Sequence, residues 1–223
     1  RICFLQVGTM FTSAGAAEIN VMNRWYGKYV IGLTGNICAG KSEVCALLVE
    51  LGAYHVDADV VAHDTLVRGR PEFARVVSEF GDSILNLDGD IDRGRLGEIV
   101  FSDAPSLARL EAILHPVIER EIDRRISHAD QCVIVLEAIK LLESGLVDDC
   151  NAIWLVAAAT EERLRRLIAR NGLDREPAQQ RVDMQATEQE KMEHADVLID
   201  NNSSLHETRA QVRRAWGKIR LSE

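Results

Sequence analysis

The 223-residue sequence contains no apolar run long enough to cross a bilayer as a helix, so we do not expect a membrane protein. Its five cysteines form no C-x-x-C pair, which argues against a zinc site or a disulfide framework and favours reduced thiols. Positive charge is scarce as well, and the net charge of −9 argues against broad binding to nucleic acid or to an anionic membrane. We therefore expect a cytoplasmic globular protein.

What the sequence does contain is a phosphate-binding loop. Residues 35–42 are GNICAGKS, which fits the pattern G-x-x-x-x-G-K-[ST]. Residues 29–34 before the loop form a short apolar stretch typical of a buried strand. After the loop, apolar residues recur at the spacing of an amphipathic helix, which Gly52 ends: Val44, Leu47, Leu48 and Leu51. Strand, glycine loop and helix are the setting that the motif requires.

The loop predicts a site for ATP and Mg²⁺. Glycines let backbone N–H groups turn toward phosphate oxygens, and the N-terminus of the following helix adds positive potential. We expect Lys41 to reach the β- and γ-phosphates and the Ser42 hydroxyl to bind Mg²⁺. The expected nucleotide-binding residues are Gly35, Asn36, Ile37, Cys38, Ala39, Gly40, Lys41, Ser42 and Glu43.

Other proteins with this loop are less consistent with the sequence. A GTP-binding switch would need the strings N-K-x-D and D-x-x-G, and neither occurs. A catalytically silent nucleotide sensor is disfavoured because Lys41, Ser42 and Asp59 are present together with several arginines. Another nucleoside monophosphate or small-molecule kinase of the same architecture stays open as the alternative.

Further apolar stretches predict a doubly wound α/β fold. We expect strands at residues 53–57, 132–136, 153–157 and 197–199, each separated from the last by helical sequence, and a final helix over 205–219. Such alternation predicts right-handed crossovers and a five-stranded parallel sheet with helices on both faces.

Three acidic residues follow predicted strands. Asp57 and Asp59 come at the carboxyl end of the second strand, which in open α/β sheets is where functional groups gather. Asp59 is also a candidate N-cap of the next helix, and His63 lies on the same helical face. Glu137 ends the third strand, where it could support Mg²⁺ through water or form a salt bridge; both interpretations stay open.

Two segments suggest mobile or accessory parts. Residues 71–130 are largely helical and have the size of a substrate-binding subdomain, although they could simply be packing helices. Pro116 predicts a kink or break near His115. Between the fourth and fifth strands lies an arginine-rich segment that suits a lid, in which we expect one or two functional arginines: Arg163, Arg165, Arg166, Arg170, Arg175 and Arg181.

From Tyr29 to Ser204 the sequence resembles the dephospho-CoA kinase family. The matching segments occur in order along the chain: residues 31–42, the V-D-A-D segment 56–59 with His63, His115-Pro116 with Ile118, Arg166 with Arg170, and Arg181, Gln185, Glu190-Lys191 and residues 195–201. This ordered set is specific, whereas a phosphate-binding loop alone is not.

The resemblance implies a P-loop NTPase fold and transfer of the ATP γ-phosphoryl group to the ribose 3′-hydroxyl of dephospho-CoA. Asp59 matches the family's base, and Lys41 its loop lysine. Arg166 matches its lid arginine, with Arg170 as the alternative and a further nucleotide contact. Residues of about 59–130 would bind the substrate, and the lid would span about 163–190. The substrate-binding residues would be Asp57, His63 and His115.

The chain also departs from the family. Ile139-Lys140 stands where a proline segment is common, Asn36 and Cys38 replace usual glycines, and Asn202 follows Asn201 where many members have glycine. Residues 1–28 are expected to be a disordered or non-native leader before the domain of residues 29–223, with Met22 as a candidate true start. We expect a monomer or a weak homo-oligomer.

Overall fold

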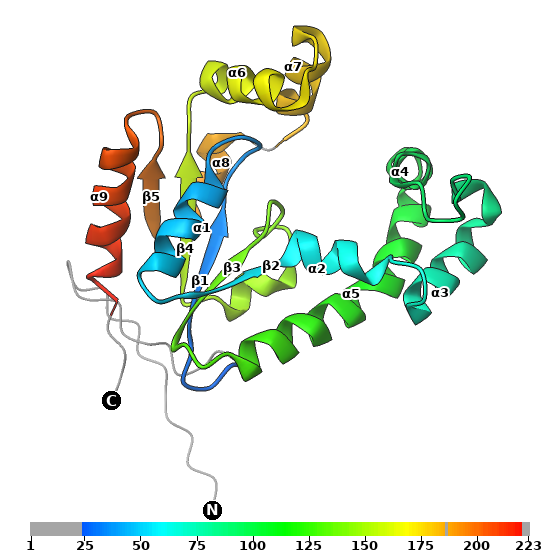
Figure 1. Ribbon diagram of the computed structural model, residues 1–223, viewed down its shortest axis with the longest axis horizontal. Helices are drawn as coiled ribbons and strands as arrows, with labels where there is room; N and C mark the ends of the chain where they lie inside the picture. Colours follow the sequence, from blue (N-terminus) through cyan, green and yellow to red (C-terminus); the bar gives the residue numbers. More distant parts are fainter. Residues whose placement is uncertain (1–23, 186, 220–223) are drawn as a thin grey trace, which may run out of the picture.

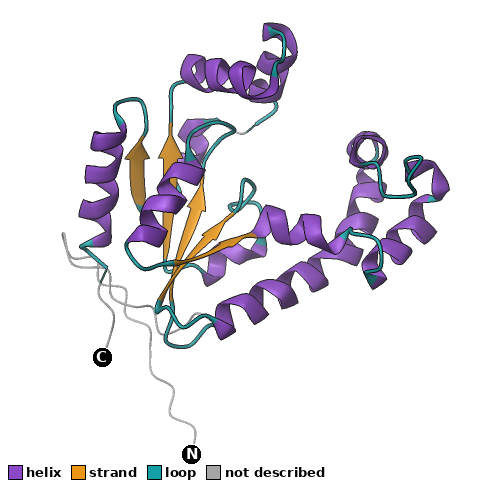
Figure 2. Ribbon diagram, in the orientation of Figure 1, coloured by secondary structure: helices purple, strands orange, loops and turns teal. Residues whose placement is uncertain are grey.

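A computed structural model describes residues 24–185 and 187–219 of the chain. Five parallel strands form a sheet in the order β2-β3-β1-β4-β5 (Figures 1 and 2). The strands are β1 (Tyr29–Thr34), β2 (Tyr54–Asp57), β3 (Val133–Glu137), β4 (Ala152–Ala157) and β5 (Val197–Asp200). The predicted five-stranded parallel sheet is confirmed. No helix in the described part of the chain has the length and apolar character needed to cross a membrane.

The sheet is covered on both faces, which explains its continuous apolar strands. On one face, Ile31 and Leu33 of β1 pack in one cluster with Leu48 of α1 (Lys41–Glu50) and Val212 of α9 (Leu205–Trp216). On the other face, Val30 packs with helices of the central part of the chain. Every residue of β1 is therefore buried.

A helical subdomain projects from the sheet (Figure 1). It comprises α2 (Ala58–Thr65), α3 (Pro71–Phe80), η1 (Asp82–Ile84), α4 (Arg93–Ser102) and α5 (Ala104–His128). It has an apolar cluster of its own, formed by Val76, Ile84, Ile91, Leu96, Val100, Ile113 and Leu114. Helix α5 also contributes Ile122 and Ile126 to the sheet cluster, so it joins the two cores.

Of the kink or break predicted near His115, the break is wrong, because α5 runs as one helix from Ala104 to His128 and contains Pro116. A proline in a helix costs about 3 kcal/mol, since it lacks an N–H and clashes with the carbonyl of Ala112. Leu114 before it and Ile122 after it are both buried, in different clusters. Packing on both sides offsets the local cost.

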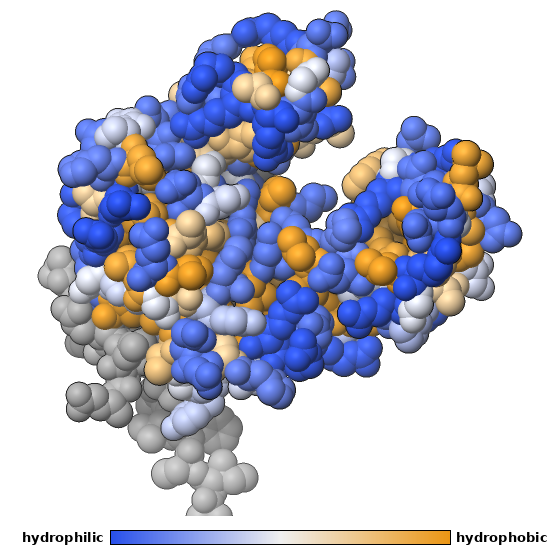
Figure 3. Space-filling model, viewed as in Figure 1, coloured by the Kyte–Doolittle hydropathy of each residue, from blue (hydrophilic) through white to orange (hydrophobic). Residues whose placement is uncertain are grey.

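A second helical unit stands over the carboxyl ends of the strands (Figure 2). Helices α6 (Thr160–Asn171) and α7 (Arg175–Asp183) form a hairpin, and α8 (Glu188–Met192) returns the chain to β5. Leu164, Leu167, Ala178 and Val182 form its apolar cluster, against which Ile37 and Cys38 of the phosphate-binding loop pack. In the space-filling view a deep hollow separates this hairpin from the helical subdomain (Figure 3).

The packed domain extends ahead of Tyr29. Residues 1–23, including Met22 and most of the expected leader, lie outside the described residues. Trp25 is only 4% exposed and packs in the cluster that contains Ile122. Its indole N–H donates to Asp123 Oδ1 at 3.0 Å, and Lys28 Nζ donates to the carbonyl of Ala129 at 2.6 Å. The boundary expected at residue 28 therefore cuts through packed structure.

Candidate active site

The phosphate-binding loop connects β1 to α1, and its two terminal glycines are sterically required. A Cβ at Gly35 would lie 2.5 Å from the carbonyl oxygen of Val156, and one at Gly40 would overlap the side chain of Asn201. Gly40 has φ 105° and is the N-cap residue of α1. Without a side chain there, no residue at the cap competes with phosphate for the first N–H groups of the helix.

Cys38 takes a left-handed conformation in this loop. Its φ of 58° is the one positive value of a non-glycine among the described residues. Glycine adopts this region without cost, whereas other residues are strained there. Cys38 stands where the family usually has glycine, and the chain keeps the left-handed backbone there at a cost in strain.

Lys41 and Ser42 lie at the start of α1 with different surroundings. Lys41 is half-buried and its Nζ donates to the Gly35 carbonyl at 3.1 Å, so its ammonium lies across the loop. Ser42 and Glu43 are exposed. The structure therefore places the lysine at the centre of the loop and the hydroxyl at its accessible rim.

Two side chains from the lid segment contact the loop. Arg166 donates from Nη1 to the carbonyls of Cys38 (3.3 Å) and Ala39 (3.4 Å) and from Nη2 to that of Asn201 (3.1 Å). Gln185 accepts a hydrogen bond from the Ile37 N–H at 2.7 Å. The lid therefore contacts the loop at an N–H group, through Gln185, and at carbonyl groups, through Arg166.

The other lid arginines have different partners. Arg170 is exposed and donates to the side chain of Asn171 at 2.9 Å, away from the loop. Arg165 pairs with Glu162 and Arg175 with Glu161, which are surface ion pairs of small energetic value. Arg163 is buried and donates to the Ala158 carbonyl at 3.1 Å. Of the predicted lid pair, the structure brings Arg166 to the loop and leaves Arg170 outside it.

The two aspartates after β2 have separate tasks. Asp57 is the N-cap of α2, and its Oδ1 accepts from the Val60 N–H at 2.9 Å. The interpretation of Asp59 as the cap is therefore wrong. Asp59 instead accepts at Oδ2 from the Ile139 N–H at 3.2 Å. Burial raises the pKa of Asp59, and the hydrogen bond from Ile139 opposes that rise.

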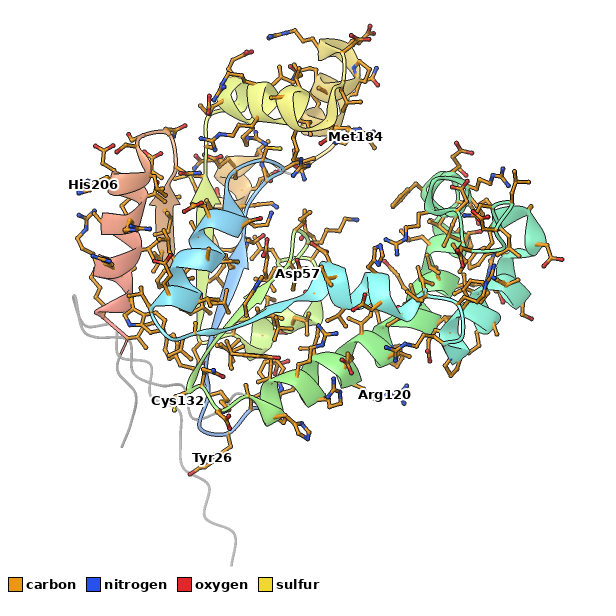
Figure 4. The ribbon with its side chains drawn as sticks, in the orientation of Figure 1. Tyr26, Asp57, Arg120, Cys132, Met184 and His206 are labelled. Carbon is orange, nitrogen blue, oxygen red and sulfur yellow. The ribbon has the colours of Figure 1, made fainter. Side chains whose placement is uncertain are left out.

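Asp59 lies where two cavities meet. One cavity of about 250 Å³ lies in the helical subdomain and is lined by Asp59, His63, Arg93, Phe101 and Leu114, among others. The other, of about 230 Å³, is lined by Asp59, His115, Lys140 and Glu143, among others. The two predicted histidines thus lie in separate cavities that share Asp59. Figure 4 shows neighbouring Asp57 at the base of the hollow.

Two side chains contact the same carboxylate oxygen of Glu137. His55 Nε2 lies 3.0 Å from Glu137 Oε2, and Cys45 Sγ donates to the same atom at 3.1 Å. Burial alone would raise the pKa of Glu137, but the hydrogen bonds from His55 and Cys45 and the charge of Lys41 lower it overall. Its contact with His55 is a salt bridge whenever the imidazole is protonated.

Sequence reasoning gave no role to Lys191 and Asn201. Lys191 is only 4% exposed and donates to the Ile139 carbonyl at 3.1 Å, and burial lowers its pKa. Asn201 donates from Nδ2 to the Ala39 carbonyl at 2.8 Å and accepts from Thr208. Both lie in segments that the family resemblance had marked, which was the available signal. Arg93, which donates to the His63 carbonyl at 3.2 Å, lay in no such segment.

Comparisons with known proteins point to one family. Residues 29–207 match the family model for dephospho-CoA kinase. The dephospho-CoA kinase of Symbiobacterium thermophilum is 43% identical over 190 residues, covering 84% of this chain and 80% of that protein. The Geobacter sulfurreducens enzyme is 38% identical, covering 85% and 98%.

Solved structures show the same likeness. The crystal structure of a Thermus thermophilus protein has a TM-score of 0.75 and 35% identity, with 85% of this chain and 96% of that chain covered. The dephospho-CoA kinase of Campylobacter jejuni has a TM-score of 0.62 and 28% identity over 86% and 96% of the two chains.

Proposed function

The chain belongs to the dephospho-CoA kinase family, and on that premise we propose how its residues divide the reaction. The enzyme phosphorylates the ribose 3′-hydroxyl of dephospho-CoA with ATP and releases coenzyme A and ADP. The observation that carries the division of roles is the position of Asp59. It lies at the junction of two cavities, close enough to Lys41 of the loop for that charge to act on its pKa.

The loop binds the phosphates of ATP in this proposal. Its N–H groups and the start of α1 provide the cradle, Lys41 contacts the β- and γ-phosphates, and Arg166 neutralises charge on the group in transfer. Phosphoryl transfer needs positioning and cationic stabilisation more than covalent help from the protein. Arg166 suits this role because it already lies on the loop carbonyls.

The residues around the loop fit a magnesium ion. Mg²⁺ prefers oxygen ligands and keeps several waters. The exposed Ser42 hydroxyl would be its protein ligand, and Glu137 would hold a metal-bound water through Oε1, since Oε2 receives His55 and Cys45. An ion held there would neutralise negative charge on the phosphates of ATP.

Asp59 acts as the general base. Its carboxylate accepts the proton of the 3′-hydroxyl as that oxygen bonds to the γ-phosphorus, while the bond from the γ-phosphorus to the bridging oxygen of ADP breaks. The raised pKa of Asp59 makes the carboxylate a better acceptor than an ordinary aspartate. The backbone hydrogen bond from Ile139 fixes the carboxylate in place.

The helical subdomain, residues of about 59–130, binds dephospho-CoA, and the cavities beside His63 and His115 hold parts of it. Asp57 contributes by holding the start of α2, and with it Asp59. The lid of about 163–190 covers the transferring phosphates.

A coupled assay of ADP release tests this function against its alternative. Dephospho-CoA, AMP, CMP and shikimate are offered separately with Mg²⁺-ATP. We expect sustained turnover with dephospho-CoA alone. Faster turnover with AMP or CMP would favour a nucleoside monophosphate kinase, and faster turnover with shikimate a small-molecule kinase of another kind.

A further inference from the structure

Behind the phosphate-binding loop, three side chains from distant parts of the chain meet. Cys45 comes from α1, His55 from β2 and Glu137 from the end of β3. One potential ligand atom of each lies within 4.8 Å of the others. Cys45 and Glu137 are buried, and the His55 side chain is 30% exposed, so the cluster is reached from the edge of the sheet.

The cluster interrupts an apolar layer. In the sheet, His55 pairs with Val135 and Asp57 pairs with Glu137, so these residues share the face that α1 covers. Elsewhere that face carries apolar residues, such as Ile31 and Val135, which pack on α1. A sulfur, an imidazole and a carboxylate therefore replace hydrocarbon at one place in this layer, and burying such groups costs free energy unless they are partnered.

We propose that Cys45, His55 and Glu137 form a binding site for a zinc-type divalent cation. The ligands are the Cys45 thiolate, His55 Nε2 and a Glu137 carboxylate oxygen, and water completes a tetrahedron. Three protein ligands with one open position are a common zinc arrangement. Sulfur and imidazole nitrogen select zinc over magnesium, which prefers oxygen ligands.

The distances between the ligand atoms suit this cation if the three side chains move slightly apart. Metal–ligand bonds of about 2.0–2.3 Å in a tetrahedron hold ligand atoms roughly 3.3–3.7 Å apart. His55 Nε2 and Cys45 Sγ lie 3.0 and 3.1 Å from Glu137 Oε2. Separation by a fraction of an ångström makes room, and the cation replaces both hydrogen bonds. The Cys45 thiol proton passes to solvent as the metal–sulfur bond forms.

Binding at this cluster has a consequence for catalysis, which rests on the proposed function. The carboxylate of Glu137 would serve both the zinc-type cation and the magnesium-bound water. A cation bound at Oε2, in place of the hydrogen bonds from Cys45 and His55, draws electron density from the carboxylate and weakens the hold of Oε1 on the magnesium-bound water. Zinc therefore inhibits the kinase from behind the loop, without occupying the ATP site.

A titration with cobalt(II) tests the site by spectroscopy and does not require kinase activity. The full chain, freed of metal, is titrated with Co²⁺ and followed by absorbance. We expect the visible bands of tetrahedral cobalt and a near-ultraviolet thiolate-to-cobalt band. Cys45→Ser should remove the thiolate band and His55→Gln should weaken binding. The control Cys132→Ser should change neither, because Cys132 is exposed and lies at the far end of the sheet (Figure 4).

Inhibition by Zn²⁺ at fixed Mg²⁺-ATP tests the coupling. We expect parent turnover to fall and to return on chelation. The zinc inhibition of Cys45→Ser and of His55→Gln is measured relative to each variant's own turnover without zinc. Both variants should need more zinc for equal inhibition, by at least the roughly 10–100-fold that loss of an outer-shell partner costs a metal site. Melting curves of both variants exclude unfolding as the cause.

Two results would overturn the proposal. A parent that gives no thiolate-to-cobalt band, or one whose band survives in Cys45→Ser, has no such site. Equal zinc sensitivity in parent and both variants places inhibition at the magnesium or ATP site and removes the coupling. Because the cobalt titration requires no substrate, its outcome is separable from failure of the kinase assignment.

Discussion

Burial raises the pKa of Asp59, and the hydrogen bond from the backbone N–H of Ile139 opposes that rise. The matching position in the family commonly carries proline, which has no N–H to donate. The N–H of Ile139 therefore gives Asp59 a hydrogen bond that a proline at this position could not give. That difference is confined to a single atom, and it can be measured.

Ile139→Pro should move the acidic limb of the pH profile of kcat/KM to higher pH. The hydrogen bond from Ile139 lowers the pKa of Asp59, so its loss raises that pKa. The base must be deprotonated to act, and its active fraction then declines at a higher pH than in the parent. Ile139→Val keeps the N–H and serves as the control. An unmoved limb in the proline variant would show that Asp59 does not govern it.

Asp59→Asn should fold normally and bind Mg²⁺-ATP like the parent, while turnover falls by roughly 10²–10⁴, the usual contribution of a positioned base. Asparagine keeps the size of the side chain but cannot take the proton. Melting temperature, ATP affinity and turnover are the three measurements. Near-parental turnover would remove the base assignment, and lost ATP binding would point to a metal-site role.

Asp57→Ala is the matched control for that variant. It deletes the cap of α2 and should cost about 0.5–2 kcal/mol of stability. The two aspartates were indistinguishable as caps in the sequence, because each precedes or opens the helix and either side chain could reach its first N–H groups. Only the backbone geometry at Asp57, which is extended while Asp59 is helical, separates the tasks.

At the level of elements, the structure of the lid decides a choice that the sequence left open. Arg166 and Arg170 lie one turn apart on α6, and both matched the expected lid arginine. Which one faces the loop depends on how α6 packs through Leu164 and Leu167, and that is a tertiary property. The sequence could name the pair but could not choose within it.

Arg166→Ala should lower kcat by about 10³-fold or more, in the range seen when an arginine that stabilises transferring phosphate is lost. Arg170→Ala should leave kcat within a few-fold, because Arg170 is exposed and bonded to Asn171. Steady-state kinetics with both substrates saturating gives the comparison. A larger loss in Arg170→Ala would mean that the lid rotates on closure and exchanges the two side chains.

The strands were predictable, whereas the path of α5 was not. Each strand is a short apolar run between turns, a pattern that survives because both faces of the sheet are covered. The proline rule behind the predicted break at His115 is local, and it ignores that α5 is anchored in two apolar clusters. The sequence analysis missed the cluster of Cys45, His55 and Glu137 for the same reason. A search for C-x-x-C spacing finds only ligands that are close together along the chain.

At the scale of the whole molecule, the domain begins earlier than the phosphate-binding unit. Trp25 is buried against α5 and bonded to Asp123, so the segment before β1 is part of the sheet core. Truncations that begin at Tyr29 therefore remove a core residue, although they keep every residue of the candidate active site.

Trp25→Ala should destabilise the protein by about 3–5 kcal/mol, as loss of a buried tryptophan typically does. In a domain of this size that corresponds to a drop in Tm of about 2–4 °C per kcal/mol. Tyr26→Ala is the control, because Tyr26 is 92% exposed. Thermal melts of the three proteins decide it, and equal melting temperatures would show that Trp25 is not part of the core in solution.

Helix α5, shared by the sheet core and the subdomain core, also sets how the molecule comes apart. If α5 detaches, both apolar cores lose buried residues. We therefore expect that the subdomain does not stay folded on its own. Its amides near Ile113 and Leu114 should then exchange with deuterium at the same slow rate as those near Ile122 and Ile126. The helical subdomain thus depends on the sheet domain for its stability, and the two unfold together.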